Sequence, residues 1–179
     1  MSDPVPFVDD DPAAIASFRR LYGQELDLHA TSSPAEGLAL LHDRGPFAVV
    51  VADMIMPAMD GIQFLGRSRE IAPETVRLVL TGHADIEAAI NAVNEVNIFR
   101  FFVKPCARST LLKGLRDAIH QHRLVTAEKE LLEKTLRGAV QVLIEVLSLV
   151  NPAAFIHSVR IRRYVQHIVE DLHIEEAWR

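Results

Sequence analysis

The stretch Phe47-Ala-Val-Val-Val-Ala-Asp53 decides the predicted fold, because it is a run of six apolar residues that ends at a carboxylate. Three consecutive valines in such a run are typical of a strand that is buried on both faces, as in a parallel sheet. Pro57 and the pair Asp60-Gly61 indicate the turn that follows. Ligands of open α/β sheets lie beyond the carboxyl ends of the strands, so Asp53 is a candidate for chemistry. The alternative is that Asp53 only caps a helix or a turn.

The sequence on both sides of this stretch alternates between predicted strands and predicted helices. Four further strands are expected, near residues 5–8, 26–30, 76–80 and 98–103. Helices are expected to begin at Asp11-Pro12, at the capping box Ser33-Pro-Ala-Glu36, near Gly61 and at Asp85. Five strands that alternate with helices predict an α/β fold with a parallel sheet and right-handed crossovers. Pro4 and Pro6 are expected to shorten the first strand, since proline cannot donate to a strand ladder.

The residues after about 108 predict helices only, with a break at Asn151-Pro152 and a last amphipathic helix from about 155 to 172. Apolar residues in the long helical stretch follow alternating steps of three and four, which is typical of a two-helix coiled-coil seam. The seam consists of Leu132, Leu136, Ala139, Leu143, Val146 and Val150. The alternative is a face that packs on the same chain, and Gly138 weakens the helix locally.

Composition excludes several classes of protein. The net charge of the 179 residues is −5, so nothing suggests a general attraction to nucleic acid or to a membrane surface. Cys106 is the single cysteine, which excludes an internal disulfide and fits a reducing cytosol. The N-terminus has no signal-peptide pattern, and the apolar stretch from Val140 to Val150 is too short and too polar to span a bilayer. A cytoplasmic protein is therefore expected.

Polar side chains follow four of the predicted strands: Asp9 and Asp10, Asp53, Thr81 and Lys104. In a parallel sheet they would all lie along one edge. Neighbouring carboxylates repel one another, which favours a divalent cation, and ligands that are all oxygen suit Mg²⁺. A carboxylate can accept a phosphoryl group, and a nearby hydroxyl and ammonium can hold the phosphoryl oxygens.

Four motifs in this order resemble the receiver domain of bacterial two-component response regulators: Phe-Val-Asp9-Asp10-Asp, Val-Ala-Asp53-Met-Ile-Met-Pro-Ala-Met-Asp-Gly61, Leu-Thr81-Gly82 and Phe-Phe-Val-Lys104-Pro105. The resemblance covers residues 1 to about 122. It implies a flavodoxin-like, doubly wound, five-stranded parallel sheet with the order 2-1-3-4-5. It also implies that a sensor histidine kinase phosphorylates Asp53, and that the chain is not an enzyme beyond the loss of its own phosphoryl group.

The same resemblance implies the metal ligands. Asp10 and Asp53 would bind Mg²⁺ directly together with the backbone carbonyl of Ile55, and Asp9 would bind it through water. Lys104 would pair with the phosphoryl group, and its bond to Pro105 would be cis.

Further roles follow from the resemblance for residues around the phosphoryl group. Thr81 would bond to it, and Phe101, three residues before Lys104, would be a switch aromatic that turns inward in the active state. The alternative for Phe101 is an ordinary core residue. Ile55 and His83 occupy the two variable positions beside the site, and we expect the apolar Ile55 to slow attack by water on the acyl phosphate.

The tail resembles the opening helix of an HD-type phosphohydrolase module of the HD-GYP-like class. His157, three residues before Arg160, matches an early metal ligand of that class, but Ala153 stands where that class tends to have a glutamate. The alternative function is therefore the regulatory half of a metal-dependent cyclic di-GMP phosphodiesterase whose catalytic part is absent from this chain. One ligand cannot hold a metal, so His157 is otherwise an ordinary helix residue. The only His-Asp dipeptide, His42-Asp43, falls in a predicted receiver helix.

We therefore expect three regions: a receiver domain at 1–122, a helical linker at 123–150, and the helical start of a truncated output module at 151–179. The expected partners are a sensor histidine kinase and a second copy of the chain. The copies would pair through the face of the fourth helix, fifth strand and fifth helix and through the linker helix. Nucleic-acid binding has little support, because Arg160, Arg162 and Arg163 are not followed by a turn and a recognition helix.

Overall fold

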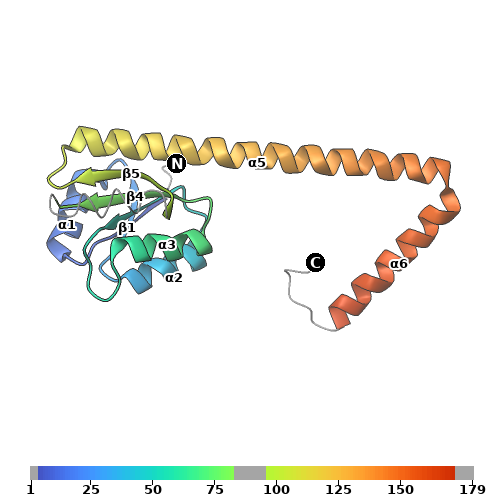
Figure 1. Cartoon of the computed structure of the whole chain (residues 1–179), viewed down its shortest axis with the longest axis horizontal. Coiled ribbons are helices and arrows are strands. Elements are labelled where there is room, and N and C mark those ends of the chain that lie inside the picture. The colour runs from blue at the N-terminus through green and yellow to red at the C-terminus, as the bar shows by residue number, and fades with distance from the viewer. Residues whose placement is uncertain (1–3, 83–95, 172–179) are drawn as a thin grey trace. The chain divides into compact units, whose positions relative to one another are not determined.

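The computed structural model describes residues 4–82 and 96–171 and divides into two compact units, 1–128 and 129–179. The first unit contains a parallel sheet with the order β2-β1-β3-β4-β5 (Figure 1). Its strands are β1 (Pro4–Val8), β2 (Asp27–Thr31), β3 (Val49–Asp53), β4 (Val76–Thr81) and β5 (Ile98–Val103). The predicted fold class and strand order are confirmed. The helix expected to begin at Asp85 lies outside the described residues.

Side chains cap the three helices that connect the first four strands, α1 (Pro12–Tyr22), α2 (Pro34–Arg44) and α3 (Gly61–Ile71). The Asp11 carboxylate accepts from the Ala13 N–H at 2.9 Å, and the Asp60 carboxylate accepts from the Gln63 N–H at 2.7 Å. Each cap satisfies one of the N–H groups that the first turn of a helix leaves unpaired. These bonds fix where the two helices begin.

The predicted capping box at the start of α2 forms only in part. The Ser33 hydroxyl accepts from the Glu36 N–H at 3.4 Å, as expected. The Glu36 carboxylate does not return to the Ser33 N–H; it accepts from the Thr31 hydroxyl at 2.5 Å, and the Ser33 N–H donates to the same hydroxyl at 3.2 Å. Thr31, the last residue of β2, is near enough to compete for both groups.

The prolines of β1 act differently on its two neighbours. Pro4 and Pro6 both lie within the strand, which pairs with β2 along all five residues, so the expectation of a shortened strand is wrong on that side. On the other side, β1 is in register with β3 only at Phe7 and Val8. Proline has no N–H to donate, which accounts for pairing that begins after Pro6.

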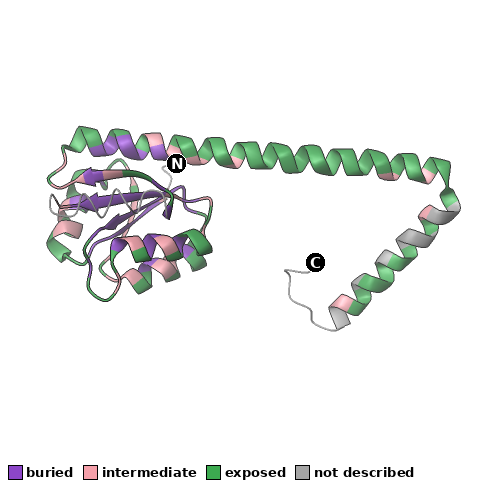
Figure 2. Cartoon of the chain, in the orientation of Figure 1, coloured by how far each residue is buried: buried purple, intermediate pink, exposed green. Residues whose placement is uncertain are grey.

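The sheet is covered on both faces, and β3 is its most buried strand. Val49 and Val51 pack into one hydrophobic cluster with residues of α1 and α5, whereas Val50 and Ala52 pack into a second cluster with residues of α2 and α3. Figure 2 shows this burial concentrated in the sheet. Because alternate residues point to opposite faces, the apolar run before Asp53 fills both layers at once.

The helical tail consists of α5 (Arg108–Val150), which has 43 residues, and α6 (Pro152–Asp171), which has 20. α5 continues without interruption through Gly138, and its buried residues all lie between Leu111 and Ala118. Asn151 separates the helices and accepts from the Phe155 N–H at 3.1 Å, so α6 begins at Pro152, three residues earlier than expected. Among the described residues, no helix has both the length and the hydrophobicity needed to cross a membrane.

The substitution Gly114→Ala should destabilise the first unit, because a β-carbon at residue 114 would collide with the Phe102 ring. Overpacking of this kind costs about 1–3 kcal/mol. Gly66→Ala, in α3, is the matched control, since no atom lies within 4 Å of the added carbon there. That change should raise the free energy of unfolding by up to about 1 kcal/mol, because alanine favours helix. Urea unfolding of both variants measures the difference, and equal effects would contradict the packing argument.

Candidate functional site at the carboxyl edge of the sheet

The polar residues predicted from strand ends are brought to one edge of the sheet. Asp53 and Thr81 are the last residues of the adjacent strands β3 and β4, and Asp9 and Lys104 directly follow β1 and β5. Backbone bonds hold these ends together: the Met54 N–H donates to the Leu80 carbonyl at 2.8 Å, and the Lys104 N–H donates to the Thr81 carbonyl at 2.7 Å. The site is therefore built on strand ends of fixed relative position.

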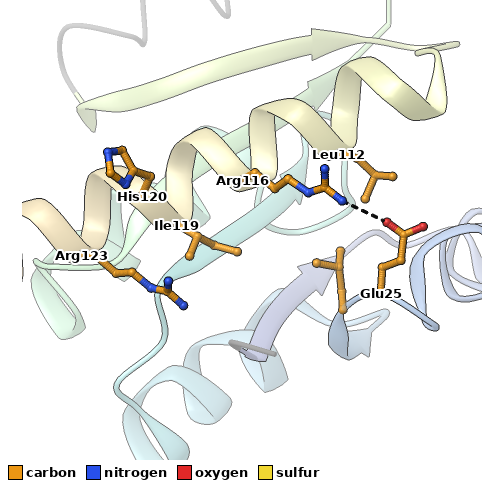
Figure 3. A pocket seen from close by; sticks show the side chains of 7 residues that line it. Glu25, Leu112, Arg116, Ile119, His120 and Arg123 are labelled. Carbon is orange, nitrogen blue, oxygen red and sulfur yellow. Dashed lines mark ion pairs between the residues drawn. The ribbon is translucent and has the colours of Figure 1, made fainter. Parts of the chain in front are cut away.

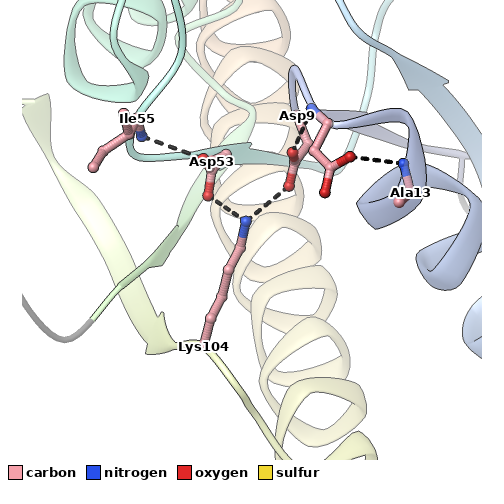
Figure 4. Close-up of polar contacts among 6 residues, drawn as sticks. Asp9, Ala13, Asp53, Ile55 and Lys104 are labelled. Atoms are coloured by element: carbon pink, nitrogen blue, oxygen red, sulfur yellow. Dashed lines mark hydrogen bonds and ion pairs between the residues drawn. The ribbon is translucent and has the colours of Figure 1, made fainter.

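One ammonium group joins two of the carboxylates. Lys104 Nζ lies 2.8 Å from Asp9 Oδ2 and 2.5 Å from Asp53 Oδ1 (Figure 4). Asp9 is almost fully buried, and its Oδ1 accepts from the Asp11 N–H at 3.0 Å. The Ile55 N–H donates to Asp53 Oδ2 at 3.3 Å. Each of these carboxylates thus has one oxygen on Lys104 and one on a backbone amide.

Asp10 completes an acidic cluster with Asp9 and Asp53, in which one oxygen from each residue lies within 4.8 Å of the others. Asp10 is exposed, so a cation can reach the cluster from solvent. Three carboxylates and one ammonium leave a negative excess, and a set of oxygen donors only is the chemistry that Mg²⁺ prefers. The residues present therefore fit the predicted metal.

Burial and ion pairing act against each other on the two charges at the centre. Burial raises the pKa of the Asp53 carboxyl above its ordinary value, and the bond to Lys104 offsets only part of that rise. Burial alone would lower the pKa of the Lys104 ammonium, but its bonds to Asp53 and Asp9 raise it overall. Lys104 is thus held in its charged form, while ionisation of Asp53 opposes folding unless a cation is added.

Gly61 is a requirement of the site that the sequence did not reveal. Its N–H donates to the Met54 carbonyl at 2.9 Å, which closes the loop between β3 and α3 directly behind Asp53. A β-carbon there would collide with the Asp53 carbonyl oxygen. The pair Asp60-Gly61 was interpreted as a turn, a helix start and part of a motif, but the close approach of two backbone segments leaves no signal in one sequence.

The remaining predicted residues fall in different environments. The Thr81 hydroxyl is buried and donates to the Gly82 carbonyl at 3.1 Å, so it is bonded locally. Phe101 is half-buried against the second hydrophobic cluster, and the Ile55 side chain is 62% exposed beside Asp53. The Lys104-Pro105 bond is cis, as predicted. His83 and the side chain of His157 lie outside what the structure describes.

A pocket of about 300 Å³ lies beside α5 and shares no residue with this site (Figure 3). Leu26, Leu112 and Ile119 contribute its apolar lining, and Glu25 pairs with Arg116 across it at 3.7 Å. Glu25 also pairs with Arg108. These contacts attach the first turns of α5 to the residues before β2, and we assign the pocket no ligand.

The family model of the response regulator receiver domain matches residues 5–116, and the chain belongs to this family. It is 35% identical to the hydrogenase transcriptional regulatory protein HoxA of Cupriavidus necator over 136 residues, which are 76% of this chain and 28% of that protein. It is 29% identical to the C4-dicarboxylate transport transcriptional regulatory protein DctD of Rhizobium meliloti over 169 residues, which are 91% of this chain and 34% of that protein. The chain thus spans about a quarter to a third of these relatives.

Solved structures agree with the family. A crystal structure described as adenylate cyclase from Rhodopirellula baltica has a TM-score of 0.72 and 36% identity, covering 75% of this chain and 99% of that one. The receiver domain of an HD domain-containing protein from Pseudomonas fluorescens has a TM-score of 0.64 and 30% identity, covering 69% of this chain and 99% of that one. These comparisons do not show the predicted HD-GYP-like tail: the two relatives are named as transcriptional regulators, and the Pseudomonas structure contains only the receiver domain of its HD domain-containing protein.

The raised pKa of Asp53 has a measurable consequence for stability. A carboxyl whose pKa is higher in the folded than in the unfolded protein favours folding when protonated and opposes it when ionised. In EDTA at pH 7, Asp53→Asn should therefore have a higher free energy of unfolding than the wild type. The difference in the free energy of unfolding should shrink as the pH falls toward about 3.9, the ordinary pKa of aspartate. Urea unfolding across this range measures it, with Glu70→Gln, an exposed carboxylate of α3, as the control; a pH-independent loss of stability in Asp53→Asn would contradict the assignment.

Proposed function

We propose that Asp53 accepts a phosphoryl group from a sensor histidine kinase, and that the chain is the phosphorylation-controlled receiver of a response regulator. The observation that carries the proposal is the position of Lys104 Nζ, within 2.8 Å of both Asp53 and Asp9. An ammonium there can pair with an oxygen of a phosphoryl group on Asp53. Membership of the receiver family supports the same function.

Each residue at the edge of the sheet has a part in the transfer. An oxygen of Asp53 forms a bond to phosphorus while the bond from phosphorus to the kinase's histidine nitrogen breaks, and the electron pair of that bond stays on the nitrogen. Asp10, Asp53 and the Ile55 carbonyl would hold Mg²⁺, with Asp9 acting through water. Mg²⁺, when bound, neutralises charge on the phosphoryl oxygens. Because Lys104 is held by Asp9, it stays beside Asp53 throughout.

The switch follows from the added charge. A phosphoryl group brings about two negative charges to a site that Lys104 only partly neutralises. The Thr81 hydroxyl, bonded to the Gly82 carbonyl in this state, would turn to the phosphoryl oxygens, and half-buried Phe101 would move into the space beside it. Phosphorylation of Asp53 would thus select between two alternative packings of side chains at β4 and β5.

We also propose that a second copy of the chain is the partner of the tail. The copies would pair through α5 and through the exposed face of β5, where Arg100 Nη1 and Asp117 Oδ2 are 3.0 Å apart. The share of the fourth helix in that face lies outside the described residues. We do not propose the phosphodiesterase alternative, because the comparisons match only the receiver domain, at residues 5–116, and relatives named as transcriptional regulators.

Beryllofluoride, a phosphoryl mimic, tests the site when it is added with Mg²⁺ and followed by NMR of the Thr81 and Lys104 amides. The wild type should bind it with Mg²⁺ and fail to bind it in EDTA. Asp53→Asn should abolish binding of beryllofluoride. Asp10→Asn should lower the affinity for Mg²⁺ at least about tenfold, because a charged ligand is lost.

Asp11→Asn is the control for both variants. Asp11 is adjacent to the cluster but caps α1, and asparagine caps a helix about as well as aspartate, so its binding should equal that of the wild type. Equal binding by Asp53→Asn and the wild type would contradict the proposal.

The lifetime of the phosphoryl group should depend on Ile55. Its N–H donates to Asp53 Oδ2 and its apolar side chain is exposed, and this side chain would limit the approach of water. Ile55→Asn should therefore shorten the lifetime severalfold, measured as loss of radiolabel from the phosphorylated chain, whereas Ile55→Leu should not. Unchanged loss in Ile55→Asn would show that this side chain does not control access.

A further inference from the structure

The second half of α5 exposes apolar side chains over most of its circumference. Every valine and leucine between residues 140 and 150 is exposed, and Leu149 and Val150 reach 81% and 77%. The polar residues Gln141, Glu145 and Ser148 form one narrow stripe, because their spacing of four and three returns to the same side of a helix. Gln141 donates to the Glu145 carboxylate at 3.2 Å within that stripe. A helix that is apolar on nearly all sides belongs in the interior of an assembly.

A two-stranded coiled coil would cover too little of this surface. Such a coil buries the seam that includes Leu136, Leu143 and Val150, but Val142 and Leu149 lie beside it and would stay in water. At roughly 30 Å² of apolar surface per CH₂ group, the exposed part of the seam amounts to roughly 700 Å² for two copies. Stable interfaces bury about 1,200–2,000 Å² in total, of which a little over half is apolar, so the seam alone reaches only the lower bound.

α6 carries the apolar surface that would complete the assembly. Ile161, Val165 and Ile168 follow a spacing of four and three, and all three are exposed. Arg160 and Arg163 lie on the other side of the helix. Ile161, Val165 and Ile168 thus give α6 an apolar stripe opposite Arg163, although Ile156 is exposed outside it, whereas the second half of α5 is apolar on nearly all sides. With α6 and the flanking positions of α5 included, the exposed apolar surface rises to roughly 2,200 Å² for two copies.

We propose that the second halves of α5 and the α6 helices of two copies form one four-helix bundle. This inference rests on the homodimer of the proposed function and replaces its two-helix seam. One copy supplies only two helices, and α6 can cover only one side of α5, so the other side requires the second copy.

The two α5 helices run parallel. Within α5 the charged residues concentrate before residue 138, and only Glu145 is charged after it. A parallel pair places the apolar stretches against each other, and unlike an antiparallel pair it also buries Leu132 and Leu136 against their counterparts.

Light scattering of the whole chain tests the bundle. The wild type should have about 40 kDa, twice the mass of 20.0 kDa, at micromolar concentration. Leu143→Glu in α5 and Val165→Glu in α6 should each reduce the mass to that of one copy. Gln141→Glu and Arg163→Glu, on the opposite sides of the same helices, are the matched controls and should stay dimeric.

Each other outcome overturns the bundle. If the wild type is monomeric, no second copy takes part and the bundle is wrong. If Leu143→Glu breaks the dimer but Val165→Glu does not, the copies pair as a two-stranded coiled coil without α6. Cross-linking checks the direction: in a Cys106→Ser background, Leu136→Cys should form a disulfide between copies when a mild oxidant is added, and failure to do so contradicts the parallel arrangement. Beryllofluoride binding measured on the same samples shows that the receiver is folded, and its loss in a dimeric wild type would contradict the receiver function but not the bundle.

Discussion

The shared ammonium of Lys104 is the interaction on which the rest of this structure depends. It lies between Asp9 and Asp53, which come from β1 and β3, and it is itself carried by the end of β5. Two carboxylates this close together repel each other, and because both are buried, ionising them without a positively charged partner would be costly. Lys104 stabilises the two ionised carboxylates in the absence of a metal. The negative charge that remains, together with that of Asp10, favours binding of a cation.

The sheet makes this arrangement possible. In a parallel sheet, residues from four distant parts of the sequence arrive at one edge, and the buried run before Asp53 fixes the central strand against both layers of the core. The edge is also where the structure is most constrained. Gly61 leaves no room behind Asp53, and the Lys104 and Met54 amides bond to neighbouring strand ends. These bonds would carry the proposed conformational change from the site to β4 and β5.

Most of the fold and the membership of the site could be predicted from the sequence, because both depend on local patterns. Apolar runs gave the strands, Asp-Pro and Ser-Pro gave the helix starts, and polar residues after strands gave Asp9, Asp53, Thr81 and Lys104. Contacts between residues that are distant in the sequence were harder to predict. The sequence did not show that Asp9 would bond to Lys104, that Thr31 would take the Glu36 carboxylate from the capping box, or that Pro6 would be accepted within β1. Each depends on which of several nearby groups is closest in the folded chain.

The most direct test of the central claim is the covalent state of Asp53 itself. The chain is incubated with acetyl phosphate and Mg²⁺, its intact mass is measured before and after hydroxylamine, and the modified residue is mapped by borohydride reduction. We predict one hydroxylamine-labile phosphoryl group per chain, on Asp53, that does not form in EDTA and forms far more slowly in Lys104→Met. A phosphoryl group on another residue, or an unmodified chain under conditions in which Mg²⁺ binds, would contradict it.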